Sequence, residues 1–303
     1  MAHSTSLRLG IDLGGTKIAG AVLHRSGAIV ASHTIASPQN DYDATLAAIA
    51  NVVGHLERSA STSCTVGVGM PGSLSPKTGL VQNANSTWLN AKPLDLDLQA
   101  LLDREIRFAN DANCFALSEA TDGAATGANS VLGVILGTGC GGGIVIDGQI
   151  LDGPRGIGGE WGHNPLPWPT PDELKIPPCW CGRQGCMETW VSGTALAADH
   201  ARTTGKNLRA EAIVAAAISG NEQARATLDR HAHRLARGLA TIVNLIDPGV
   251  IVLGGGLSSI PHLYTSLPTL MAPYVFTDAP TITIRRPKHG PASGVRGAAW
   301  LWP

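Results

Sequence analysis

The stretch Leu7-Arg8-Leu9-Gly10-Ile11-Asp12-Leu13-Gly14-Gly15-Thr16-Lys17 is an apolar run that ends in a glycine turn, and Ile18 to Leu23 resumes as a second apolar run. This pattern predicts a β-hairpin. The pattern recurs where residues 131–136 and 143–146 flank Gly137-Thr138-Gly139-Cys140-Gly141-Gly142, at an offset of 123 residues. Such a repeat predicts a duplicated α/β domain whose hairpins face a shared cleft.

Composition limits the classes of protein to which the chain can belong. It has 303 residues, 22 Lys+Arg against 23 Asp+Glu, and 44% hydrophobic residues. The length allows roughly two domains of ordinary size. The hydrophobic content excludes a disordered chain, and the absence of a basic excess predicts no nucleic-acid partner. Because Met1–Ser6 show no secretory signal and no long apolar run comes after them, we expect a cytoplasmic protein without a membrane partner.

The two glycine turns are candidate phosphate-binding loops. Without Cβ atoms, glycines let backbone N–H groups approach phosphate oxygens. In the first turn this role falls to Gly14, Gly15, Thr16 and Lys17, while Asp12 can hold Mg²⁺ through water; the alternative is an ordinary hairpin turn. The second turn, with Gly137, Thr138 and Gly139, formally satisfies G-x-G-x-x-G, but a strand comes after it where a dinucleotide-binding fold needs a helix.

A third glycine turn, Gly254-Gly255-Gly256, comes directly after a buried strand. It is either a plain connection from strand to helix or a nucleotide contact.

Three cysteines lie within eight residues in Cys179-Trp180-Cys181-Gly182-Arg183-Gln184-Gly185-Cys186. Three thiolates need one more ligand for tetrahedral Zn²⁺, and His163 lies upstream across a proline-rich loop. We therefore predict a Cys₃His zinc site, with free or oxidised cysteines as the alternative. Cys64, Cys114 and Cys140 receive no role.

Asn110-Asp111 lies between a predicted strand and a predicted helix. Asp111 is either a helix N-cap or a general base that accepts a hydroxyl proton during phosphate transfer. Glu160, His163 and Glu188 bring carboxylates and an imidazole to the metal segment. They suit hydrogen bonding to a polyol, or they support the metal ligands.

Together these residues resemble the ROK family of bacterial sugar kinases, from about Leu7 to Trp302. The resemblance is carried by Gly10–Lys17, Asn110–Asn113, Gly137–Gly139, Gly159–His163 and Cys179–Glu188. Within the family, Asn83–Asn90 and Ser293–Trp302 are most similar to bacterial fructokinase, also described as mannofructokinase.

The resemblance implies an actin-like, hexokinase-type α/β fold with two ribonuclease-H-like lobes and a cleft. It implies a discontinuous smaller lobe of residues 1–115 plus 290–303, and a larger lobe of residues 116–289 containing the zinc segment 163–188. ATP, Mg²⁺ and a structural Zn²⁺ are the implied cofactors, and a homodimer is a further expectation. The implied ATP contacts are Asp12, Gly14, Gly15, Thr16, Lys17, Gly137, Thr138, Gly139, Gly255 and Gly256.

The implied reaction is phosphorylation of a hexose at its 6-hydroxyl, with Asp111 as the base. The implied sugar contacts are Gly72, Asn85, Asn110, Asp111, Glu160, His163 and Glu188. D-Fructose is the predicted sugar, from the motif set and the segment Asn85-Ser86-Thr87-Trp88, and glucose, mannose or an N-acetylhexosamine are alternatives. The proline-rich loop after His163 is longer than in the family's glucokinases, so their substrate range does not carry over to this chain. A sugar-sensing ROK regulator is a distant alternative, since only Met1–Ser6 precede the first strand.

Overall fold

The hairpin predicted at the start of the chain forms in the computed structural model, which describes residues 7–303. Strand β1 (Leu7–Leu13) pairs antiparallel with β2 (Lys17–His24), so that Leu13 lies opposite Ile18. Gly14 N donates to Lys17 O at 3.0 Å and closes the turn.

The predicted repeat is confirmed by a second hairpin later in the chain. Strands β8 (Ser130–Leu136) and β9 (Cys140–Ile146) begin 123 residues after β1 and β2. The two five-stranded sheets have the orders β3-β2-β1-β4-β7 and β10-β9-β8-β11-β12, in each of which the hairpin leads into parallel strands. Their other strands are β3 (Ile29–Ala36), β4 (Thr65–Met70), β7 (Ile106–Asn110), β10 (Gln149–Ile150), β11 (Val250–Gly254) and β12 (Ile284–Arg285).

The chain divides into two compact units. Unit 1 contains the residues up to Gly127, Gly143–Gly158 and Lys288–Pro303, and unit 2 contains Ala128–Gly142 and Gly159–Pro287. This division differs from the predicted domain bounds because residues 116–127 and 143–158 belong to unit 1. The physical reason is that helix α3 (Asp111–Thr121) packs against the C-terminal helix of unit 1 and against β10, which lies within residues 143–158.

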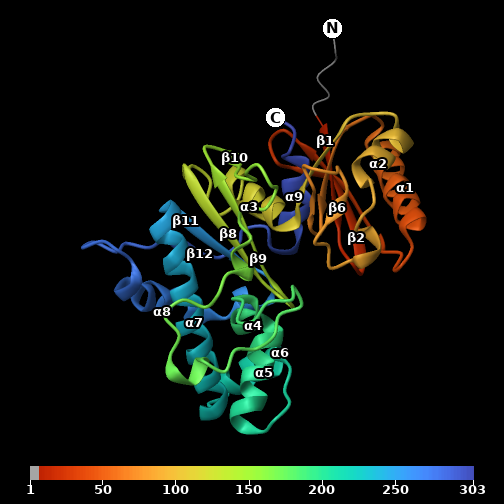
Figure 1. Cartoon of the computed structure of the whole chain (residues 1–303). Coiled ribbons are helices and arrows are strands. Elements are labelled where there is room, and N and C mark those ends of the chain that lie inside the picture. Colours follow the sequence, from red (N-terminus) through yellow and green to blue (C-terminus); the bar gives the residue numbers. More distant parts are fainter. Residues whose placement is uncertain (1–6) are drawn as a thin grey trace. The chain divides into compact units, whose positions relative to one another are not determined.

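The sheet of unit 1 is covered on both faces (Figure 1). Leu9 and Ile11 of β1 point into an apolar core shared with helices α1 (Tyr42–Ala60) and α2 (Leu94–Leu102). Because successive side chains of a strand alternate in direction, Gly10 faces the other side. There a Cβ on Gly10 would lie 1.9 Å from Val295 O of α9 (Ser293–Ala299). A small hairpin, β5 (Ser73–Leu74) and β6 (Val81–Gln82), completes this unit's strands.

Helices predominate over strands in unit 2, and they break near Gly205 and Gly220. Gly205 adopts φ +73° and ends a helix in the left-handed conformation that glycine favours. The longest helix, α7, packs against its neighbours α4, α5, α6 and α8 (Figure 1). Their bounds are α4 (Glu188–Val191), α5 (Gly193–Thr204), α6 (Ala210–Ile218), α7 (Glu222–Ile246) and α8 (Pro261–Met271).

The second glycine turn is shorter than predicted. Strand β9 begins at Cys140, so Gly141 and Gly142 belong to the strand and not to the turn. A Cβ on Gly142 would lie 2.6 Å from Trp161 Cδ1, and one on Gly143 would lie 2.5 Å from Ala112 O. These two glycines therefore serve close packing of the strand.

Among residues 7–303, no helix is long and apolar enough to cross a membrane. Met1–Ser6, on which the expectations about a secretory signal and a preceding regulatory domain rest, lie outside the described residues.

Gly297 and Gly54 provide a matched pair of helical glycines. A Cβ on Gly297 would lie 1.7 Å from the backbone oxygen of Cys114, whereas one on Gly54 would meet only the flexible end of Arg58 at 3.2 Å. We expect Gly297→Ala to lower the free energy of unfolding by about 1–3 kcal/mol or more. Gly54→Ala should leave it unchanged or raise it by up to about 1 kcal/mol. Denaturant unfolding of both variants checks this, and a fully stable Gly297→Ala variant would contradict the packing.

Candidate active site

The first glycine turn holds a partly buried carboxylate. Asp12 lies near the end of β1, and the start of α9 approaches it so closely that a Cβ on Gly294 would lie 2.9 Å from Asp12 Oδ2. Burial raises the pKa of Asp12, and the charge of Lys17 partly opposes that effect. A carboxylate, a tight backbone turn and a lysine therefore lie together in unit 1.

The second glycine turn is fastened to the start of α5 in unit 2. Gly137 O accepts a hydrogen bond from Gly193 N at 2.7 Å, and Thr138 O accepts one from the Thr194 hydroxyl at 2.9 Å. A Cβ on Gly139 would lie 2.6 Å from Glu188 Oε2, so this position has no room for a side chain. The turn is thus held rigidly beside a helix N-terminus.

A cavity of about 680 Å³ opens beside this turn and lies entirely within unit 2. Its volume is that of a pocket for a small molecule. Of the predicted ATP contacts, Gly137, Thr138 and Gly256 line it, whereas Gly139 and Gly255 do not. Gly255 instead allows the tight turn, because it adopts φ +78° and a Cβ added there would lie 2.4 Å from Leu136 O.

One wall of this cavity is the face of α6, which sequence reasoning missed. Helix α6 presents apolar and charged side chains to the cavity, and the preceding residue adds a guanidinium. The sequence gives no signal for this wall, and only the structure shows that Ile218 at the end of α6 is exposed. The lining residues from this region are Arg209, Ala210, Glu211, Val214, Ala215 and Ile218.

The Asn110-Asp111 pair lies where β7 passes into α3. Asn110, and not Asp111, is the N-cap, because its side-chain oxygen accepts from Ala112 N at 2.9 Å. Its Nδ2 donates to Gly72 O at 3.0 Å, which joins the ends of two neighbouring parallel strands. Asp111 begins the helix with Oδ1 2.8 Å from Ala112 N. A helix N-terminus favours a negative charge on this carboxylate.

The segment that contains Asn85 has mainly a packing role. Trp88 Nε1 donates to the Thr45 hydroxyl on α1 at 3.2 Å, and Leu89 is buried. The side chain of Asn90 bonds both the backbone N–H and the oxygen of Ala84 at 2.9 Å. Asn85 itself is exposed.

The predicted metal ligands come together in unit 2. The ligand atoms of His163, Cys179, Cys181 and Cys186 all lie within 4.8 Å of one another. Cys181 Sγ lies 3.6 Å from Cys186 Sγ, and Cys179 Sγ lies 3.7 Å from His163 Nδ1. Sulfurs bound at about 2.3 Å around a tetrahedral Zn²⁺ are about 3.7 Å apart, so these residues fit that ion.

Glu188 connects the metal segment to the second glycine turn. Its Oε2 accepts from Cys140 N at 2.9 Å, and its Oε1 accepts from Trp180 Nε1 at 2.6 Å. The Trp180 ring meets the His163 ring edge-on at 5.1 Å. Glu160 is exposed and directly precedes the 3₁₀ turn Trp161–His163.

Trp180 is a second residue that sequence reasoning missed. It is 63% exposed although it contacts both His163 and Glu188. The signal in the sequence is its place between two predicted metal ligands, Cys179 and Cys181.

The comparisons with known proteins agree with this geometry. A model of the ROK family matches residues 8–303. This chain belongs to the ROK family. The resemblance inferred from the motifs is confirmed, and the described chain has the sugar-kinase fold of the ROK family.

Three relatives illustrate the match. An N-acetyl-D-glucosamine kinase of Escherichia coli O127:H6 is 40% identical over 296 residues, which cover 96% of this chain and 98% of that protein. The crystal structure of a ROK hexokinase from Thermus thermophilus has a TM-score of 0.86 at 31% identity and covers 97% of both chains. A ROK family glucokinase from Streptomyces griseus, in complex with glucose and AMPPNP, has a TM-score of 0.78 at 27% identity and covers 97% of this chain and 98% of that one.

Removing one thiol tests the metal site. We expect Cys181→Ala to lower bound zinc from about one ion per chain to nearly none, because three ligands hold a structural Zn²⁺ poorly. Cys64→Ala is the matched control, since Cys64 is a buried thiol outside the cluster. Elemental analysis of the purified proteins is the measurement. A full zinc content in Cys181→Ala would rule out this ligand set.

Proposed function

We propose that this protein transfers the γ-phosphate of ATP to the 6-hydroxyl of an N-acetylhexosamine, with N-acetyl-D-glucosamine as the preferred sugar. The observation that carries the proposal is the 40% identity, over 96% of this chain, to an N-acetyl-D-glucosamine kinase. The structure of a ROK glucokinase with glucose and AMPPNP supports a nucleoside triphosphate as the donor.

Asp111 is the proposed general base. As the sugar's 6-oxygen forms its bond to the γ-phosphorus, the bond from that phosphorus to the leaving ADP oxygen breaks, and the hydroxyl proton passes to the Asp111 carboxylate. The start of α3 favours the ionised carboxylate that this step requires. Asn110, bonded to Gly72 O and Ala112 N, fixes the backbone from which Asp111 projects.

The proposed nucleotide contacts lie in the glycine turns. Gly137, Thr138 and Gly256 line the cavity of about 680 Å³, whose α6 wall offers apolar surface to a base. Gly139 and Gly255 shape the loops behind that surface. Gly14, Gly15, Thr16 and Lys17 would contact phosphate, with Asp12 near Mg²⁺ through water. When bound, Mg²⁺ neutralises charge on the transferred group.

The proposed sugar contacts are Gly72, Asn85, Asn110, Asp111, Glu160, His163 and Glu188. In this proposal Zn²⁺ would have a structural role, because His163 would hold it through Nδ1, the ring nitrogen that faces Cys179 Sγ, and would keep its other ring nitrogen for a sugar hydroxyl. Trp180 belongs with this group, since it contacts both His163 and Glu188.

D-Fructose, the sugar expected from the sequence, is the second candidate. Its support is the resemblance at Asn83–Asn90. Much of that segment packs against α1 and the core, which leaves Asn83, Asn85 and Thr87 exposed for sugar contact. The proposal therefore places the N-acetylhexosamine first.

A sugar panel tests the function. Purified protein with ATP and Mg²⁺ is given N-acetyl-D-glucosamine, D-fructose, D-glucose and D-mannose, and ADP release is followed. We expect the kcat/KM for N-acetyl-D-glucosamine to exceed the others by about tenfold or more, because a site that hydrogen-bonds the acetamido group is left with unpaired groups by the other sugars. A preference for fructose would assign the second candidate instead. No ADP release with any of these sugars would refute the kinase.

The proposed base has its own test. Asp111→Asn should lower kcat by about 10²–10⁴-fold and leave the Kd of the sugar within a fewfold, because the amide cannot accept the proton. Asp147→Asn is the matched control, since Asp147 is exposed in a turn with φ +48°, a conformation that asparagine tolerates. Single-turnover rates and calorimetric sugar binding are the measurements. Near-normal turnover of Asp111→Asn would remove this residue from the chemistry.

A further inference from the structure

The proline-rich segment 164–178 connects two proposed metal ligands, His163 and Cys179. Six of its fifteen residues are prolines, which have no backbone N–H to donate. Its ends are held by backbone bonds, from Leu166 N to Gly185 O at 3.1 Å and from Gly185 N to Pro177 O at 2.8 Å. Its middle must therefore be held mainly by side chains.

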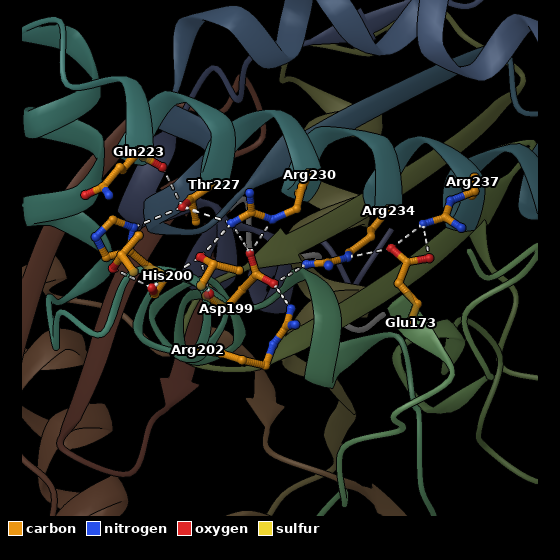
Figure 2. A network of polar contacts seen from close by, with 11 residues as sticks. Glu173, Asp199, His200, Arg202, Gln223, Thr227, Arg230, Arg234 and Arg237 are labelled. Atoms are coloured by element: carbon orange, nitrogen blue, oxygen red, sulfur yellow. Dashed lines mark hydrogen bonds and ion pairs between the residues drawn. The ribbon is translucent and has the colours of Figure 1, made fainter. Parts of the chain in front are cut away.

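Glu173 provides this anchor. It ends a 3₁₀ turn, Pro171–Glu173, and its Oε2 accepts from Thr170 N at 2.9 Å. The carboxylate is only 7% exposed and lies against α7, where it meets two arginines (Figure 2). Arg234 Nε donates to Oε1 at 2.8 Å, and one Arg237 terminal nitrogen lies 2.8 Å from both carboxylate oxygens.

Arg237 adds a second attachment, because its other terminal nitrogen donates to the backbone oxygen of Trp168. Burial alone would raise the pKa of Glu173, but the hydrogen bonds from Thr170 N, Arg234 and Arg237 outweigh it and hold the pKa below its usual value. The carboxylate is thus ionised at neutral pH, and its charge is matched by buried guanidinium groups.

We propose that Glu173 is a positioning residue for the metal site: by fixing the middle of segment 164–178 on α7, it orders His163 and Cys179 before the metal binds. The inference rests on the proposed metal site. Ligands joined by a loose fifteen-residue loop would have to be ordered by the metal itself, at the expense of its affinity. An anchored loop removes most of that cost.

Asp199 of α5 provides the matched control within the same network. It pairs with Arg202, Arg230 and Arg234, and none of these partners lies in segment 164–178 (Figure 2). Its side chain is as buried as that of Glu173, at 6% exposed. Asp199→Asn removes the same charge from the same cluster without releasing the segment.

The experiment measures the Zn²⁺ affinity of the full chain by competition with a chromophoric chelator. We expect Glu173→Gln to weaken zinc binding by about 10-fold or more, as for other residues that support metal ligands, and Asp199→Asn to stay within about 2-fold of wild type. Arg237→Lys keeps the charge but cannot bond Glu173 and Trp168 O together. It should fall between the two, and it serves as the test if Glu173→Gln does not fold.

Two further measurements separate positioning from general destabilisation. Limited proteolysis of the metal-free protein should cut Glu173→Gln within segment 164–178 faster than Asp199→Asn. In the kinase assay, Glu173→Gln should raise the KM of the sugar by several-fold with kcat nearly unchanged.

The proposal is overturned if wild type binds no zinc, if both Glu173→Gln and Arg237→Lys bind zinc like wild type, or if Asp199→Asn loses as much affinity as Glu173→Gln. The zinc and proteolysis measurements need neither sugar nor ATP. A wrong substrate assignment would therefore leave their outcome intact.

Discussion

The packing of unit 1 depends on positions where two backbones touch and only glycine fits. A Cβ would overlap a carbonyl oxygen of α9 at Gly10 and Gly67, and one of α3 at Gly297. The C-terminal helix can therefore lie directly on the sheet and on α3 only because these positions lack side chains. Since β1 carries Asp12 and α3 begins with Asp111, the same contacts fix where both carboxylates stand. Glycine in this chain thus serves positioning as well as turns.

In unit 2, two glycines leave room for side chains. Gly139 leaves room for the carboxylate of Glu188, and Gly142 leaves room for the ring of Trp161. Glu188 is in turn bonded to Trp180, which lies between Cys179 and Cys181, two of the predicted metal ligands. The glycine turn, the carboxylate and the metal segment are consequently coupled through direct contacts, so none of them can shift alone.

Local patterns predicted much of this structure, and long-range packing decided the rest. The hairpins, the repeat and the cluster of His163 with three cysteines could be predicted, because each depends on neighbouring residues or on ligand chemistry. The early start of β9 was not predicted, because Gly141 and Gly142 have the local signal of a turn, and the packing of Gly142 against Trp161 is a contact between residues distant in sequence. The α6 wall of the cavity and the burial of Glu173 were missed for the same reason, since their partners lie far away in sequence. Asp111 illustrates a further limit: a helix cap and a base have the same sequence signal, and only the bond from Ala112 N to Asn110 showed which residue is the cap.

The two copies of the repeated hairpin differ most in the connection that leaves their second strand. In the first copy β2 turns into β3, a strand of eight residues, whereas in the second copy β9 leads to β10, of two residues, and then to the long connection that carries the metal segment. The duplicated cores are therefore alike where they pack and unlike in one surface connection. Such an arrangement separates the part of the chain that must stay constant for folding from the part that is free to vary. A change in the length or anchoring of that connection would therefore leave the strands of both sheets in place.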